Sequence, residues 1–159
     1  MSFYFYTETA FHHEGDYDYL VKLIDESKDI GVNGIKFQVL FELNSLTSSR
    51  HNKYNELSKL IFDQLEWKSV FERSINYGLD LIVMPLDCSV FELINQFKRQ
   101  IKYLELHSVS FNDENLKSQI KDSKIPLILG IGGRTLDEIE DLLNYFNGQV
   151  KILMHGFQS

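Results

Sequence analysis

The sequence predicts an α/β fold of parallel strand–helix units, about six in number, which is too few to close an eight-unit barrel. Short apolar or aromatic segments alternate with segments in which apolar residues keep helical spacing, and no linker or low-complexity segment interrupts them. Strands that alternate with helices of this length form parallel βαβ units with right-handed crossovers. A doubly wound sheet or an incomplete barrel is therefore expected, as a single domain over residues 1–159.

The first half of the chain contains three expected strands separated by two helices. Residues 3–8 favour a strand because they are aromatic and rich in Thr, and their aromatic side chains are expected to pack within the fold. Apolar residues at helical spacing predict a helix over 17–30, with Asp16 as its N-cap and Gly31 at its end. The same pattern then predicts a strand over 34–38, a polar loop through 55, a helix over 67–77 and a strand over 79–85.

The second half repeats the alternation with shorter connections. Helices are expected over 90–97, 113–122 and 136–146, and strands over 103–107, 126–130 and 150–155. The polar stretch 44–55 remains as the one long loop. Long loops in α/β folds are often functional, although a merely variable surface loop is an equally good interpretation.

Composition and charge limit the classes of function. The hydrophobic fraction of 43% and the charged fraction of 25% are those of an ordinary globular protein, so disorder is not expected. The net charge of -7 opposes a nucleic-acid partner, which needs clustered Lys and Arg, whereas a small anionic substrate depends only on the local field. A single cysteine, Cys88, and an N-terminus without a leader or membrane span predict a cytoplasmic protein.

Polar residues gather where the expected strands end. In parallel α/β folds the carboxyl ends of the strands form the binding sites, so these residues are expected to converge on one pocket: Glu8, Lys36, Gln38, Asp87, Glu105, His107, Ser108, the turn at 130–133 and His155. Lys36 lies between two apolar residues, and an interior lysine is costly unless it is paired. Glu8 is its natural partner. The pair could serve a substrate or be a structural ion pair, and the residues alone leave both interpretations open.

Two further patterns carry weaker hypotheses. The adjacent His12 and His13 point apart on an extended turn, and zinc needs three or four ligands at suitable spacing, so no metal site is assigned to them. The turn at 130–133, followed by Arg134 and Thr135, could hold an anion with its backbone N–H groups. A plain strand-to-helix turn is the simpler interpretation.

A series of short motifs follows the same order along the chain. Residues 8–15 read ETAFHHEG and residues 36–38 read KFQ, which resembles the opening of the sialic acid synthase family, E-I-x-x-N-H-x-G followed by K-x-Q. Later segments resemble the family's S-T-P-F, K-I-x-S-G, P-V-I-L-S-T-G and L-L-H-C motifs; they lie at 83–87, 105–108, 126–132 and 153–156. Each motif is weak alone, but their order and intervals together are fairly specific.

The resemblance implies a fold and a reaction. Members of that family are TIM barrels that condense phosphoenolpyruvate with an N-acylated hexose to give a nonulosonic acid, assisted by a divalent metal such as Mn or Mg whose ligands are not expected in this chain. By resemblance Glu8 is the catalytic carboxylate, Lys36 a phosphate or carboxylate contact and Gln38 a polar contact. His107, Ser108 and His155 are expected to line the substrate pocket.

Four positions depart from the family pattern, the first being His12, which stands where the family has an asparagine. Glu105 stands where the family has a lysine, Ser110 where it has an acidic residue, and Gly130 where it has a serine. A carboxylate in place of a phosphate-facing lysine reverses the local charge, and two like charges ~4 Å apart repel by ~4 kcal/mol at an effective dielectric constant of 20. The expected binding of phosphate is weakened accordingly.

Three hypotheses about function remain after the sequence is considered. The first is an enzyme of the sialic acid synthase type that uses phosphoenolpyruvate and an N-acylhexose. The second is a non-catalytic sugar-binding or scaffold module derived from that family. The third is a short protein whose final strand, over 150–155, pairs with a second copy to form a homodimer, because an unpaired sheet edge is otherwise a liability.

Overall fold

The computed structural model describes residues 3–156 as one six-stranded sheet that curls into an incomplete barrel. Every neighbouring pair of strands is parallel and the spatial order follows the chain order. The strands are β1 (Tyr6–Glu8), β2 (Gly34–Val39), β3 (Asp80–Pro85), β4 (Ile101–Leu106), β5 (Leu127–Gly130) and β6 (Val150–Met154). This confirms the incomplete TIM-barrel type over the alternative of a doubly wound sheet, in which the strand order would reverse.

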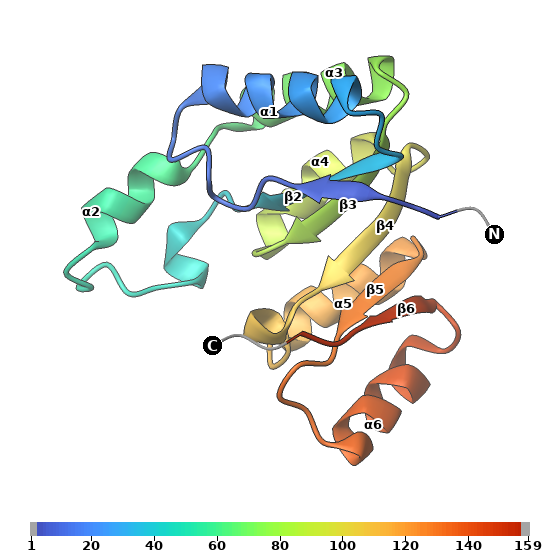
Figure 1. Cartoon of the computed structure of the whole chain (residues 1–159). Helices are drawn as coiled ribbons and strands as arrows, with labels where there is room; N and C mark the ends of the chain where they lie inside the picture. The colour runs from blue at the N-terminus through green and yellow to red at the C-terminus, as the bar shows by residue number, and fades with distance from the viewer. Residues whose placement is uncertain (1–2, 157–159) are drawn as a thin grey trace.

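The helices lie along the outer side of the curled sheet (Figure 1). They are α1 (Tyr17–Asp29), α3 (Gln64–Asn76), α4 (Phe91–Gln96), α5 (Glu114–Ser123) and α6 (Leu136–Phe146), with the single turn α2 (Tyr54–Leu57) inside the long loop. Helices on one side and an open concave side on the other are the arrangement of a TIM barrel before closure.

Alternation along the strands separates the core from the concave side. In β2, Ile35, Phe37 and Val39 point outward and join the main apolar cluster beneath the helices, whereas Lys36 and Gln38 point inward. The same alternation in β4 sends Leu104 outward and Glu105 inward. The sheet thus places charged residues on its concave side without breaking the core.

Side-chain caps fix where the helices begin. Asp16 accepts a hydrogen bond from the backbone N–H of Tyr19, which confirms it as the N-cap of α1. Asp63 forms a capping box with Glu66 at the start of α3. The apolar spacing predicted that this helix begins at 67. That predicted start was wrong, because the cap allows a further helical turn before the first buried residue.

The N-terminal segment also differs from the expectation. β1 covers only Tyr6–Glu8, and the side chains of Phe3 and Phe5 are 76% and 62% exposed. The prediction that these aromatic residues pack within the fold was therefore wrong. Pairing with β2 begins only at Tyr6, which lies opposite Gly34.

The long loop after β2 packs over a second, smaller apolar cluster. This cluster consists of Leu40, Leu43, Met84 and Leu86, with Phe11, Tyr54, Leu57 and Ile61 against it. It lies at the carboxyl ends of β2 and β3, so the loop is anchored at the mouth of the incomplete barrel.

The length and hydrophobicity of the described helices bear on whether any of them could cross a membrane. Within residues 3–156 no helix is both long and apolar enough to cross a membrane. The expected lack of a leader also concerns Met1 and Ser2, which lie outside the described residues.

Candidate functional site

A buried ion cluster lies at the carboxyl ends of β1, β2 and β4. The Nζ atom of Lys36 lies 3.0 and 3.1 Å from the two carboxylate oxygens of Glu105 and 2.9 Å from Oε2 of Glu8. The Lys36 side chain is 4% exposed and that of Glu105 is fully buried, whereas Glu8 is 39% exposed. The predicted pairing of Lys36 with Glu8 is confirmed, and Glu105 is a second partner.

Both buried members of the cluster are held in their charged forms. Burial acts to lower the pKa of Lys36, but the charges and hydrogen bonds of Glu105 and Glu8 outweigh it, so that pKa is raised. Burial acts to raise the pKa of Glu105, but the neighbouring His107 and Lys36 outweigh it and the pKa is lowered. The ammonium group therefore stays protonated and already has two anionic partners.

Two more of the predicted residues join this cluster through their side chains. The Nε2 atom of Gln38 donates a 2.9 Å hydrogen bond to Oε1 of Glu8. The Nδ1 atom of His107 lies 3.5 Å from Oε1 of Glu105. Four predicted residues thus meet with Glu105 at the mouth of the incomplete barrel: Glu8, Lys36, Gln38 and His107.

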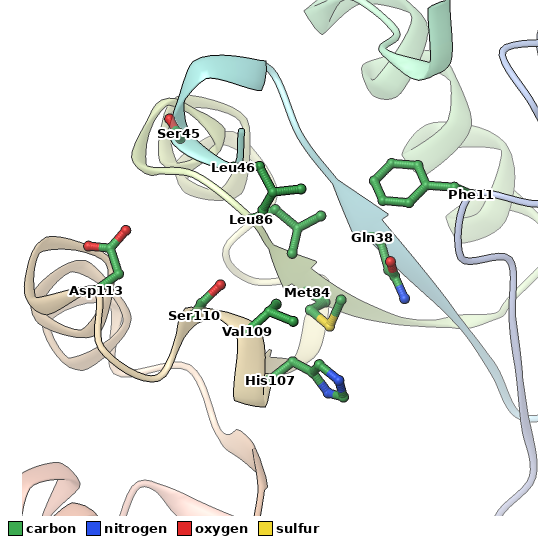
Figure 2. A pocket seen from close by; sticks show the side chains of 10 residues that line it. All are labelled: Phe11, Gln38, Ser45, Leu46, Met84, Leu86, His107, Val109, Ser110 and Asp113. Carbon is green, nitrogen blue, oxygen red and sulfur yellow. The ribbon is translucent and has the colours of Figure 1, made fainter. Parts of the chain in front are cut away.

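A cavity of about 450 Å³ opens beside the cluster. Figure 2 shows Gln38 and His107 reaching toward it from the ends of β2 and β4, with Met84 between them. Its walls come from the ends of β2 and β3 and from the loops after β1, β2, β3 and β4: Phe11, Gln38, Ser45, Leu46, Met84, Leu86, His107, Val109, Ser110 and Asp113. A space of this size with apolar walls and a few polar groups is typical of small-molecule sites.

The remaining predicted residues line a neighbouring cavity. Ser108, His155 and the other side of His107 border a space of about 490 Å³ beside the turn at 130–133. Gly130 lies close to this side chain, because a Cβ atom there would lie 3.3 Å from the carbonyl oxygen of Leu106 and 3.4 Å from Nδ1 of His107. His107 is therefore the one predicted residue that borders both cavities.

Asp87 holds the loops that form the mouth. It is buried, and its Oδ2 accepts from the backbone N–H groups of Phe41 and Glu42 at 2.6 and 3.0 Å. Its Oδ1 accepts from the N–H groups of Ser89 and Val90 at 2.8 and 3.3 Å. One carboxylate thus ties the long loop after β2 to the turn after β3.

Sequence reasoning placed Glu105 among the polar residues at the strand ends and noted it as a departure from the family pattern, but did not predict its contact with Lys36. Its signal was present, because a charged residue between the apolar Leu104 and Leu106 is subject to the same argument that singled out Lys36. Arg134 follows the turn at 130–133, for which a plain strand-to-helix turn was the simpler interpretation. It donates to the carbonyl of Ser108 at 3.2 Å and stacks over Phe111, 4.0 Å from the ring centroid.

His13 lies in the interior of the fold, where it has a structural role. Its ring is fully buried, lies 4.6 Å from the Phe62 ring centroid and accepts a hydrogen bond at Nδ1 from the N–H of Gly15. Burial, assisted by the charge of His12, lowers its pKa. Across residues 3–156 no three His, Cys, Asp or Glu side chains are grouped so as to hold a metal ion. The expected divalent metal does not fit the described residues, and no chemical step is assigned to it.

The curled parallel sheet and the polar mouth define a protein of the incomplete TIM-barrel class, with its candidate site at the carboxyl ends of the strands. The sequence profile of the NeuB family matches residues 23–158, and the chain belongs to that family.

Solved structures support the same placement. N-acetylneuraminic acid (sialic acid) synthetase from Leptospira borgpetersenii is 26% identical, with a TM-score of 0.83; the match covers 99% of this chain and 55% of that one. A putative spore coat polysaccharide biosynthesis protein E from Chromobacterium violaceum is 19% identical over 94% of this chain and 48% of that one, with a TM-score of 0.78, which shows the shared fold.

A curated relative from Methanocaldococcus jannaschii is an uncharacterised protein, 25% identical over 132 residues. That match covers 83% of this chain and 38% of the relative. The chain thus spans well under two thirds of the relatives it matches. The chain is thus a NeuB-family member that is similar to a sialic acid synthetase over about half of that protein's length.

Proposed function

We propose that the mouth of the incomplete barrel takes part in condensing phosphoenolpyruvate with an N-acylated hexose to give a nonulosonic acid. The observation that carries the proposal is that Glu8 accepts hydrogen bonds from both Lys36 and Gln38 beside a cavity of about 450 Å³, in a chain of the NeuB family. A cation and a carboxylate at one mouth are the groups that such a reaction needs.

In this proposal each group has one task. Carbon 3 of the enol bonds to the aldehyde carbon of the sugar, water adds to carbon 2, and phosphate leaves by cleavage of its C–O bond. Lys36 would bind the negative charge of phosphoenolpyruvate. Glu8, the exposed carboxylate of the cluster, would accept and donate the protons that the reaction transfers. Gln38 would orient Glu8 through the hydrogen bond between them.

The charge balance of the cluster sets a condition on this reaction. One ammonium group faces two carboxylates, so the three side chains carry a formal charge of −1 before any ligand arrives. Phosphoenolpyruvate must therefore compete with Glu105 for Lys36, against a repulsion of ~4 kcal/mol for like charges ~4 Å apart at an effective dielectric constant of 20. Weak binding of phosphoenolpyruvate is expected, and Glu105→Gln is expected to tighten it at least tenfold.

The test is release of inorganic phosphate from phosphoenolpyruvate by the purified chain with N-acetylmannosamine, with and without MnCl₂. The expected result is release that depends on the sugar, together with a product whose mass is that of the two substrates plus one water less phosphoric acid. Glu8→Gln keeps the shape of the side chain and is expected to abolish the release. Phosphate release that does not depend on the sugar, or no release in any mixture, would contradict the proposal.

A second candidate function is a non-catalytic sugar-binding module, and the observation that favours it is the bidentate contact of Lys36 with the fully buried Glu105. This contact occupies the cation from within the protein. The two candidates differ in one experiment, a titration with phosphoenolpyruvate and N-acetylmannosamine separately. Saturable binding of the sugar alone, with neither binding nor turnover of phosphoenolpyruvate, would favour the module.

A further inference from the structure

The imidazole ring of His107 lies between the two cavities of the mouth and borders both. Its side chain is 28% exposed, yet its Nδ1 atom is buried and makes no hydrogen bond within residues 3–156. Oε1 of Glu105 lies 3.5 Å from that atom. The other ring nitrogen, Nε2, is therefore the one that remains accessible to a ligand.

The contact with Glu105 decides which nitrogen can act as a base. A carboxylate beside Nδ1 favours the tautomer with its proton on Nδ1, which leaves the lone pair on Nε2. Lys36 keeps that carboxylate charged, since its charge is among the causes that lower the pKa of Glu105. The 3.5 Å separation is longer than an ordinary hydrogen bond, and such contacts commonly shorten when a ligand binds.

An N-acylated hexose must open its ring before its aldehyde can react, and a base that takes the anomeric proton speeds the opening. The anomeric hydroxyl loses its proton, the carbonyl forms at carbon 1, and the bond from carbon 1 to the ring oxygen breaks. Both the apolar walls and the polar groups of the cavity of about 450 Å³ suit a sugar of this size, and Nε2 of His107 is the accessible base at its edge.

We propose that His107 is the general base that opens the ring of an N-acylated hexose bound in the mouth, with Glu105 as its positioning residue. Nε2 takes the proton of the anomeric hydroxyl, and the departing ring oxygen takes a proton from water. The hydroxide that forms then removes the proton from the imidazolium, so the protein ends as it began. The inference shares its sugar with the proposed function but needs neither phosphoenolpyruvate nor a metal.

Several charged or titratable groups set the field around the ring. Glu105 faces it directly, and Lys36 and Glu8 are coupled to Glu105. Asp113 borders one cavity with His107, and His155 borders the other. Arg134 is bound to the carbonyl of Ser108, next in the chain. These groups act on the pH profile of every variant alike. The change in the profile from one variant to another therefore reports on His107 and Glu105, which a single profile does not.

The test follows the anomers of N-acetylmannosamine by proton NMR, starting from one crystalline anomer in a buffer without phosphate, phosphoenolpyruvate or metal. The chain is expected to speed anomer equilibration in proportion to its concentration, more strongly as pH rises. His107→Gln is expected to lower the acceleration ~100-fold, the usual scale for general-base catalysis. Glu105→Gln is expected to lower it ~10-fold and move the profile to lower pH, because a supporting carboxylate is lost.

His51→Gln is the matched control, because His51 is exposed, lies in the long loop and borders neither cavity. It should equilibrate the anomers as fast as the unaltered chain. No acceleration at saturating sugar, or equal acceleration by the His107→Gln variant, would overturn the inference. Ring opening without phosphate release would leave the inference standing while the proposed condensation fails, and the reverse result would remove the inference alone.

Discussion

At the scale of single residues, the concave mouth is organised by one buried ammonium group and the carboxylates that balance it. A buried ion pair gains little net stability over apolar residues, but removal of one partner leaves a charge with less compensation. Lys36 would keep Glu8 if Glu105 were neutralised, so a partial loss is expected rather than complete unfolding.

Glu105→Gln tests this balance. The variant keeps the side-chain volume and removes the charge, so the free energy of unfolding is expected to fall by about 2 kcal/mol, the scale of a hydrogen bond to a charged group. Urea denaturation at neutral pH measures it. Glu72→Gln is the matched control, because the exposed Lys68–Glu72 pair at 3.9 Å should contribute less than about 1 kcal/mol. Equal losses for the two variants would contradict the description of the cluster.

The pH dependence of stability depends on His13. Burial lowers its pKa in the folded chain, whereas the unfolded chain recovers the ordinary value near 6.5. The unfolded state therefore binds more protons, and the contribution of neutral His13 is complete above pH 6.5 and is lost as pH falls below it. Stability should decline between pH 7 and 5.5 by up to about 1.4 kcal/mol per pH unit.

His13→Asn checks the assignment. Its side-chain oxygen can still accept the N–H of Gly15, while the titrating ring is removed. The variant is expected to be less stable at pH 7 but to show a flatter decline in urea denaturation between pH 7 and 5.5. His51→Asn removes an exposed imidazole and should keep the full slope. An unchanged slope in the His13 variant would assign the pH dependence to another group.

Reasoning from the sequence predicted the contact of Lys36 with Glu8 but not its contact with Glu105. Glu8 and Lys36 lie on neighbouring strands, and strand order alone places them together. Glu105 lies two strands away on β4, and its approach depends on the curl of the sheet and on the register of β2, β3 and β4. Sequence spacing does not contain that information.

At the scale of elements, apolar periodicity located every helix and strand of the regular units, while several boundaries depended on side-chain caps and pairing. α6 matches its predicted range, because Thr135 and the apolar pattern start at the same point. α3 starts earlier than predicted because Asp63 caps a turn that has no buried residue. β1 is shorter because pairing with β2 begins only at Tyr6.

Two carboxylates that both cap backbone N–H groups should respond differently to Asp→Asn. Asp63 uses only Oδ1, which accepts from Leu65 and Glu66, and asparagine is as good an N-cap as aspartate. Asp87 uses both oxygens, so an amide group would face N–H donors on one side. Asp87→Asn is expected to cost more than about 2 kcal/mol and Asp63→Asn less than about 0.5 kcal/mol in urea denaturation. Similar losses would contradict the anchoring role of Asp87.

At the scale of the whole molecule, the sheet has two edges. β1 pairs only with β2 and β6 only with β5 within residues 3–156. Leu153 in β6 is 47% exposed, whereas the central strands are buried. The alternation of strands and helices predicted the parallel sheet, but the distinction between a doubly wound sheet and a barrel depended on strand order, for which only the family resemblance offered a guide.

Amide hydrogen exchange tests this gradient. Strand β3 is paired on both sides and buried, so its amides at residues 81–83 should exchange most slowly, and those of β6 at residues 152–154 should exchange faster. Mass spectrometry of peptides from dilute protein measures both. Faster exchange in β3 than in β6 would contradict the sheet order. Protection of β6 that increases with protein concentration would support the homodimer, which stays a prediction.

In the function proposed above, the polar mouth at the carboxyl ends of β1, β2 and β4 is a ligand site of the sialic-acid-synthase type. The most direct measurement is the shift of backbone amide NMR signals on titration with N-acetylmannosamine. Saturable shifts that concentrate at residues 8–11, 36–38 and 107–110, and that weaken in the Gln38→Leu variant, are predicted. Shifts that concentrate away from these segments, or none at millimolar sugar, would contradict the claim.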